Sequence, residues 1–142
     1  MKYAMRTVVL ALTMLPLLAA AQLSGTQKIV VQVPFEFVVG NQVVPSGEWM
    51  VQKASTDTSI LVIRNNTGSV GMFSIASLQD TKEAAGNYSL VFHKYGNSYF
   101  LSGVRVRGSR TGYRIPQSKA EAEMRAQNVS ATEEILVASL KR

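Results

Sequence analysis

One segment in the second half of the chain constrains the fold more than any other. Two runs rich in β-branched and aromatic residues, YSLVFHKY at 88–95 and SYFLSGVRV at 98–106, are separated only by Gly96-Asn97. A two-residue connection that starts with glycine is typical of a tight β-hairpin, because glycine adopts the positive φ that such turns require. The segment therefore predicts two adjacent antiparallel strands.

The turn also sets the register of this hairpin. Residues that face each other across an antiparallel pair lie on the same side of the sheet, so fixing one pair fixes the others. The predicted pairs are Tyr95 with Ser98, Lys94 with Tyr99, His93 with Phe100, Phe92 with Leu101 and Val91 with Ser102.

Continued without a break, this register would place Arg105 and Arg107 on the same face as Leu101. Unpaired arginines are costly to bury, so we expect the second strand to change phase at Gly103 through a β-bulge. The bulge would turn Val104 and Val106 towards the core.

Other segments extend the β pattern on both sides of this hairpin. A first hairpin is predicted around Gly40-Asn41, a strand at 48–53 contains Trp49, and a second hairpin joins 60–64 to 69–78 through the turn at 65–68. We predict a mainly β fold, a small antiparallel β-sandwich or partly open barrel with one short C-terminal helix. Its core should include Trp49, Phe92 and Leu101.

The pattern changes after Pro116. Ser118 and Glu121 form a capping box, which predicts a short helix near 118–127, and Glu121 stands four residues before Arg125. Only three alanines and Met124 offer apolar contacts, so we expect this helix to lie against the sheet as a lid. The tail at 130–142 fits either a helix or a closing strand.

The first 21 residues have the features of a secretory signal. Lys2 and Arg6 precede an apolar run at 8–18, and Ala19, Ala20 and Ala21 follow it. The run contains Pro16 and is shorter than the roughly 20 apolar residues that a membrane span needs. We expect cleavage after Ala21, an exported product in the periplasm or outside the cell, a flexible lead-in at 22–27 and a single β-rich domain at 28–142.

The composition excludes several kinds of chemistry. The chain has no cysteine and one histidine, His93, so neither a cysteine-based metal site nor a Cys-His pair can form. No serine lies in a GxSxG motif, and Glu36 and Glu48 are best explained as exposed residues of half-buried strands. We therefore predict no catalytic residue, no metal ligand and no cofactor.

One cluster of charge stands out from this background. From Lys94 to Lys119 the chain has six basic residues and no acidic one, whereas the chain after residue 21 has 13 basic and 9 acidic residues. We predict an exposed surface for an anionic ligand, formed by Lys94, Arg105, Arg107, Arg110 and Arg114, with the four arginines side by side. Charge runs more often form a solvated strand edge, on which these charges prevent sheet-to-sheet aggregation, and the sequence leaves both interpretations open.

Three segments together resemble a known family. VPFEFVVGNQVVPSGEWMV, LVFHKYGNSYFLSGV and GYRIPQSKAEAEM are similar to the VPFxFxVG, LVFHxYGxxYFL and LPxSxAExE motifs of a family of small exported bacterial proteins without an assigned function. The resemblance covers most of 33–127. It implies a compact β-rich domain, the short helix near the C-terminus and a final strand at 135–140, and it supplies no activity.

These features favour a non-catalytic exported domain that binds a partner or belongs to the cell envelope. We expect the partner to be an acidic polysaccharide, an anionic lipid or another envelope protein rather than nucleic acid. The alternative is a self-assembling envelope or matrix component, in which runs such as SLVF and YFLSGV join a neighbour's sheet edge. A hydrolase with an unrecognised site is the third possibility.

Mass spectrometry of the exported protein tests the predicted cleavage. We expect the mature chain to begin at Gln22, because small residues occupy the last position of the signal and the position two before it. An intact Met1 on a membrane-embedded product would show that the signal interpretation is wrong.

Overall fold

The computed structural model describes residues 28–127 and 129–141. The predicted signal at 1–21 and the lead-in at 22–27 lie outside the described residues. Within the described part of the chain, no helix is long and apolar enough to cross a membrane.

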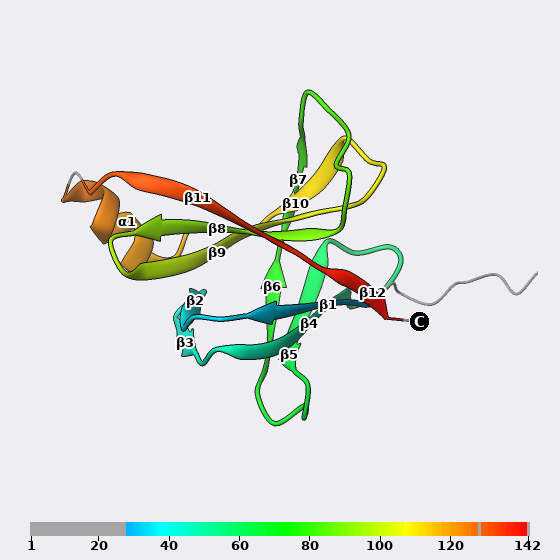
Figure 1. Cartoon of the computed structure of the whole chain (residues 1–142), viewed down its shortest axis with the longest axis horizontal. Helices are drawn as coiled ribbons and strands as arrows, with labels where there is room; N and C mark the ends of the chain where they lie inside the picture. The colour runs from blue at the N-terminus through cyan, green and yellow to red at the C-terminus, as the bar shows by residue number, and fades with distance from the viewer. Residues whose placement is uncertain (1–27, 128, 142) are drawn as a thin grey trace, which may run out of the picture.

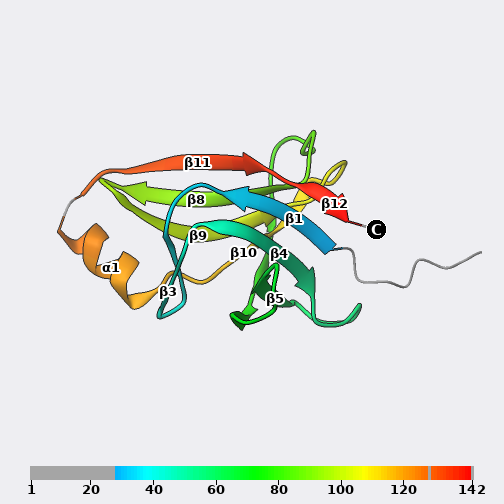
Figure 2. The same cartoon turned by 60° about the horizontal axis from the view of Figure 1, so that its bottom comes forward.

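The structure contains two β-sheets, which do not close into a barrel, and one short helix (Figures 1 and 2). We call the sheets A and B. Sheet A has five strands in the order β12 (Ser139–Lys141), β1 (Lys28–Val33), β4 (Gly47–Lys53), β5 (Ile60–Asn65) and β6 (Gly71–Ile75). All of its neighbouring strands are antiparallel. The mainly β fold predicted from the sequence is confirmed.

Sheet B has seven strands. Its main path runs through β11 (Ala131–Val137), β8 (Ser89–Tyr95), β9 (Ser98–Arg105), β10 (Thr111–Arg114) and β7 (Ser77–Asp80). The short hairpin of β2 (Phe37–Val39) and β3 (Gln42–Val44) joins β9 through a single parallel pair, Val38 with Phe100. The tail at 130–142 was compatible with either a helix or a strand in the sequence, and in the structure it forms the strands β11 and β12.

The central hairpin has the predicted register as far as Phe92. Gly96 has a φ of 59°, as its turn requires, and Tyr95 faces Ser98 while Phe92 faces Leu101. The bulge lies one residue earlier than predicted, because Val91 pairs with Gly103 and leaves Ser102 as the extra residue on β9. The predicted pair of Val91 and Ser102 is therefore wrong.

Ser102 suits this position because its Oγ donates a hydrogen bond to the Val91 carbonyl oxygen, 3.3 Å away. The bulge turns Val104 towards the core, where it is buried as predicted. Val106, which we also expected in the core, is only partly buried.

Over residues 28–127 and 129–141, the chain crosses between the sheets at four points. Pro34 and Pro45 lie at the two crossings of the long hairpin that runs from β1 through β2 and β3 to β4. The other two crossings are at buried alanines: Ala76 joins β6 to β7, and Ala138 joins β11 to β12. The segment 69–78, predicted as one continuous strand, is thus divided between the sheets at Ala76.

The core lies between the two sheets and receives side chains from both. Phe37 links them, since its ring meets Trp49 of sheet A and Phe92 of sheet B in edge-to-face contacts with centroids 5.4 and 5.3 Å apart. Trp49 Nε1 donates to the Pro45 carbonyl oxygen at 3.0 Å, so its one polar atom has a partner. The prediction that Trp49, Phe92 and Leu101 lie in the core is confirmed.

The runs SLVF and YFLSGV are not free to join another sheet. They belong to β8 and β9, and each of these strands has a paired neighbour on both sides. The structural basis that we expected for self-assembly is therefore wrong, because the β-rich runs form the middle of sheet B.

Truncating Phe92 tests the role of this core. Phe92 is fully buried and contacts the rings of Phe35 and Phe37 edge-on. We expect Phe92→Ala to lower the free energy of unfolding by about 3–5 kcal/mol, measured by chemical denaturation. Val43→Ala, at a side chain that is largely exposed, is the control and should cost less than about 0.5 kcal/mol. Equal effects of the two variants would contradict this description of the core.

Candidate functional site: a hollow on the outer face of sheet B

The helix α1 (Lys119–Ala126) lies at one end of sheet B, beside the turn of the β8–β9 hairpin (Figures 1 and 2). Ser118 caps it, and the Ser118 Oγ accepts the backbone N–H of Glu121 at 3.1 Å. Only this half of the predicted capping box forms, because the Glu121 side chain turns towards the sheet.

The helix is attached to the sheet by a carboxylate. Ala120, Ala122 and Ala126 are exposed and Met124 is partly buried, whereas Glu121 is only 3 % exposed. The helix is held to the sheet through Glu121 and not through the apolar contacts that we expected. The chain thus places a charged group where a lid would ordinarily have a hydrophobic one.

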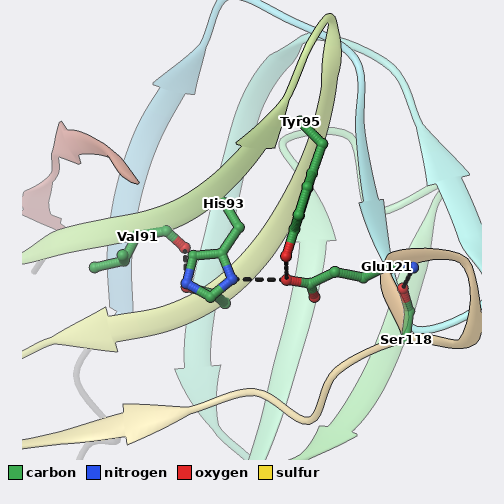
Figure 3. A network of polar contacts seen from close by, with 6 residues as sticks. Val91, His93, Tyr95, Ser118 and Glu121 are labelled. Atoms are coloured by element: carbon green, nitrogen blue, oxygen red, sulfur yellow. Dashed lines mark hydrogen bonds and ion pairs between the residues drawn. The ribbon is translucent and has the colours of Figure 1, made fainter. Parts of the chain in front are cut away.

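Two side chains of β8 satisfy this carboxylate. His93 Nδ1 lies 2.6 Å from Glu121 Oε1, and the Tyr95 hydroxyl donates to the same oxygen at 3.0 Å (Figure 3). His93 and Tyr95 point to the same face because they are two residues apart on one strand. A buried carboxylate is costly unless it is hydrogen-bonded, so these two contacts make the position of Glu121 tenable.

The network changes the acidity of Tyr95. Burial, the hydrogen bond to Glu121 and the negative charge of Glu121 all raise the pKa of the Tyr95 hydroxyl above its usual value of about 10. Arg125 opposes this shift. Tyr95 therefore remains a neutral hydrogen-bond donor throughout the physiological pH range.

Beside this network lies a hollow of about 270 Å³, bordered by His93 and Glu121. Its floor includes Gly103 and Gly112, which lie on the neighbouring strands β9 and β10. A Cβ atom would stand 2.8 Å from the Tyr113 carbonyl oxygen at Gly103 and 2.7 Å from the Val104 carbonyl oxygen at Gly112. Both positions thus require glycine, and without side chains there the sheet is hollowed. We call this site the glycine-floored hollow.

Three arginines border the glycine-floored hollow: Arg105, Arg114 and Arg125. Arg105 forms an ion pair with Glu133 of β11, with 2.8 Å between Nη2 and Oε1. Among the described residues, neither Arg114 nor Arg125 has an ion-pair partner. The hollow thus has two guanidinium groups that form no ion pair with the nearby carboxylates of Glu121 and Glu133, and Gln117 also borders it.

The residues of the predicted anionic-ligand surface are only partly brought together. Arg105 and Arg114 border the hollow, whereas Arg110 borders an adjacent one with Arg105 and donates from Nε to the Thr81 carbonyl oxygen at 3.2 Å. Arg107 is exposed on the loop after β9. Lys94 lies on the opposite face of sheet B, with Nζ 5.4 Å from the centre of the Tyr99 ring.

The sequence did not identify Arg125 and Glu121 as site residues. Their spacing of four predicted a pair along the helix, but Glu121 bonds to the sheet, and Arg125 borders the hollow instead. The run from Lys94 to Lys119 also has no acidic residue, whereas the fold brings Glu121 and Glu133 to the same site. The capping box indicated that Glu121 lies in the first turn of a helix, but no feature of the local sequence showed that its side chain points towards the sheet.

Within the described residues, no three His, Asp or Glu side chains gather as metal ligands do. Ser102 borders the hollow with His93, but its hydroxyl donates to the Val91 carbonyl oxygen. Glu36 borders a different hollow, at the β2–β3 hairpin, and Glu48 lies on β4 of sheet A.

Comparisons with known protein families, curated proteins and solved structures give no match to this chain. The site is therefore interpreted from its own geometry.

The pH dependence of stability tests the Tyr95–Glu121 contact. Tyr95→Phe removes a donor to a buried carboxylate, so we expect a loss of about 1.5–3 kcal/mol at neutral pH. Above about pH 10 the tyrosine of the unfolded chain loses its proton, whereas folded Tyr95 keeps it because its pKa is raised. The free energy of unfolding of the parent therefore falls as the pH rises. Tyr95→Phe has no hydroxyl at this position and does not show this fall. The stability difference between them should therefore narrow at alkaline pH in denaturation experiments.

Leu101→Ala is the matched control for this pH series. Leu101 is buried on the other face of the hairpin and has no titrating group, so its stability deficit should stay nearly constant from about pH 8 to about pH 11. A deficit of Tyr95→Phe that stays equally constant would contradict the raised pKa of Tyr95.

Proposed function

We propose that this protein is an exported, non-catalytic binding domain of the cell envelope that holds an anionic group of an acidic polysaccharide in the glycine-floored hollow. The observation that carries the proposal is the pair of guanidinium groups, Arg114 and Arg125, which border one hollow without a carboxylate partner among the described residues. Guanidinium groups bind carboxylates, sulfates and phosphates through paired hydrogen bonds.

The surroundings of these arginines favour a sugar over a lipid tail. Gln79 and Gln117 also border the hollow, and amide side chains can both donate to and accept from sugar hydroxyl groups. The hydroxyl of Thr81, which borders the hollow as well, already donates to the Glu83 and Arg110 carbonyl oxygens. Arg105 is already paired with Glu133, which lowers the positive charge at the rim. A ligand with few charges and many hydroxyl groups suits such a lining better than a highly charged polymer does.

The His93–Glu121 contact fits a structural role in this proposal. Glu121 fastens α1 to the sheet and so sets the position of Arg125, one helical turn further along. A nucleophile activated by His93 would need to lie within hydrogen-bond reach of the histidine. The Ser102 hydroxyl is instead bonded to a backbone carbonyl oxygen, which supports binding rather than hydrolysis.

Export is part of the proposal because of the N-terminal sequence. The basic start, the short apolar run and the alanine cluster before Gln22 are typical of a cleaved signal, and the resemblance to small exported bacterial proteins agrees with them. An acidic polysaccharide is a ligand that such a protein meets in the periplasm or at the cell surface.

Binding to an acidic oligosaccharide tests this function. We expect a hyaluronan tetrasaccharide, which carries a carboxylate only on alternate sugars, to bind the mature chain in isothermal titration. Its affinity should fall as salt rises, because the attraction between the carboxylate and the guanidinium groups is electrostatic. Arg114→Gln combined with Arg125→Gln should weaken binding at least about tenfold, equivalent to about 1.4 kcal/mol, while the melting temperature changes little.

A second double variant separates the hollow from general positive charge. Lys94→Gln with Arg107→Gln removes the same net charge at two places away from the hollow, so its binding should stay within about twofold of the parent, less than about 0.5 kcal/mol. Equal losses in the two double variants would contradict a localised site. Binding to phosphatidylglycerol vesicles but not to the oligosaccharide would replace the sugar by a lipid headgroup.

A further inference from the structure

Two long strands form the outer edges of the molecule. On one side the continuous segment β6–Ala76–β7 is the last strand of both sheets, and on the other side β11–Ala138–β12 is the first strand of both (Figure 1). Within the described residues, no strand pairs with the outer side of either segment. Each edge therefore presents backbone groups to which another strand can bond.

The pairing of β6 shows which of its residues face outward. Asn65 N–H donates to the Val70 carbonyl oxygen and Ala76 N–H to the Ser59 carbonyl oxygen. Because hydrogen-bonded pairs alternate along an antiparallel ladder, Met72 and Ser74 also bond to β5. Gly71, Phe73 and Ile75 are left with their N–H and C=O groups directed away from the sheet.

The same residues carry exposed apolar side chains. Phe73 is 76 % exposed and Ile75 73 % exposed, and both lie on the outer face of sheet A beside Val62 and Ile60 of β5. Leu78, on the continuation of this edge in sheet B, is 64 % exposed. An edge that combines free backbone groups with exposed apolar side chains is unusual for a protein that stays alone.

The two edges are protected to different degrees. Natural edges usually carry charges or proline, which discourage pairing with another strand. The segment 65–79 contains neither, whereas β11 carries Glu133 and Glu134. Charge thus protects the β11 edge, and nothing of this kind protects the β6 edge.

We propose that β6 pairs antiparallel with β6 of a second copy of this chain, so that two A sheets join into one. With Phe73 opposite Phe73 of the second copy, Gly71 faces Ile75 and Ile75 faces Gly71, and all three outward-facing residues find hydrogen-bonded partners. This register is self-complementary, because the position without a side chain faces the bulky isoleucine. The two Phe73 rings lie on one face and cover each other.

A second copy fits this edge better than a charged partner does. Identical strands without charge bring no like-charge repulsion into the contact, and a two-fold axis through Phe73 uses the same patch on both chains, as in most homodimers. Because β6 is only five residues long, the contact is small, and we expect a reversible dimer. This interaction uses sheet A and is independent of the glycine-floored hollow on sheet B.

Sedimentation of the mature chain over a wide concentration range tests the proposal. We expect a monomer–dimer equilibrium, and Ile75→Lys, which adds a charge to the unprotected edge, should raise the dimer dissociation constant at least about tenfold. Val137→Lys is the matched control: Val137 is a β-branched residue that is 64 % exposed on the opposite edge, and its change should leave the equilibrium as it is.

Cross-linking tests the register separately. The chain has no cysteine, so Phe73→Cys introduces a single thiol that lies opposite its copy, and a short thiol-specific cross-linker should join two chains. In the proposed register Ile75 faces Gly71 of the second copy, so the two thiols of Ile75→Cys lie far apart along the strands. The cross-linked yield of this variant should be much lower. A strictly monomeric protein, a dimer unaffected by Ile75→Lys, or a dimer lost in Val137→Lys would each overturn the proposal.

Discussion

The two sheets share one core because the chain crosses repeatedly between them, and each crossing bends the chain at a residue whose backbone N–H is either absent or paired. Proline stands at residues 34 and 45 and has no N–H. Buried alanines stand at 76 and 138, where the N–H groups bond to the carbonyl oxygens of Ser59 and Tyr88. A chain without cysteine thus joins its sheets through shared strands and one common core.

The site follows from what lies on the outer face of sheet B. Close packing of β9 against β10 requires Gly103 and Gly112, and the missing side chains leave a hollow. The helix that borders it is fastened by Glu121, whose charge is compatible with burial only because His93 and Tyr95 bond to it. One polar network therefore both attaches the helix and brings Arg125 to the hollow.

The crossings also explain why the molecule has two such long edges. A strand that passes from one sheet to the other can be the last strand of both, as β6–β7 and β11–β12 are. Each of these two segments therefore presents unpaired backbone groups along the edges of both sheets. Since β11 carries Glu133 and Glu134 whereas β6 has no charged residue, the two edges have different capacities for interaction.

The features that depend on neighbours along the chain could be predicted from the amino-acid sequence: the turn at Gly96-Asn97, the register up to Phe92 and the helix capped by Ser118. The predicted position of the bulge was wrong by one residue, because it depends on contacts with other strands. Ser102 bonds to the Val91 carbonyl oxygen, and Gly103 packs against the Tyr113 carbonyl oxygen. Only the tertiary structure joined His93 to Glu121, 28 residues apart, and separated Lys94 from Arg114. Hydrophobic period and turn chemistry act over a few residues, whereas the partner of a polar side chain is set by which strands and helices meet in space.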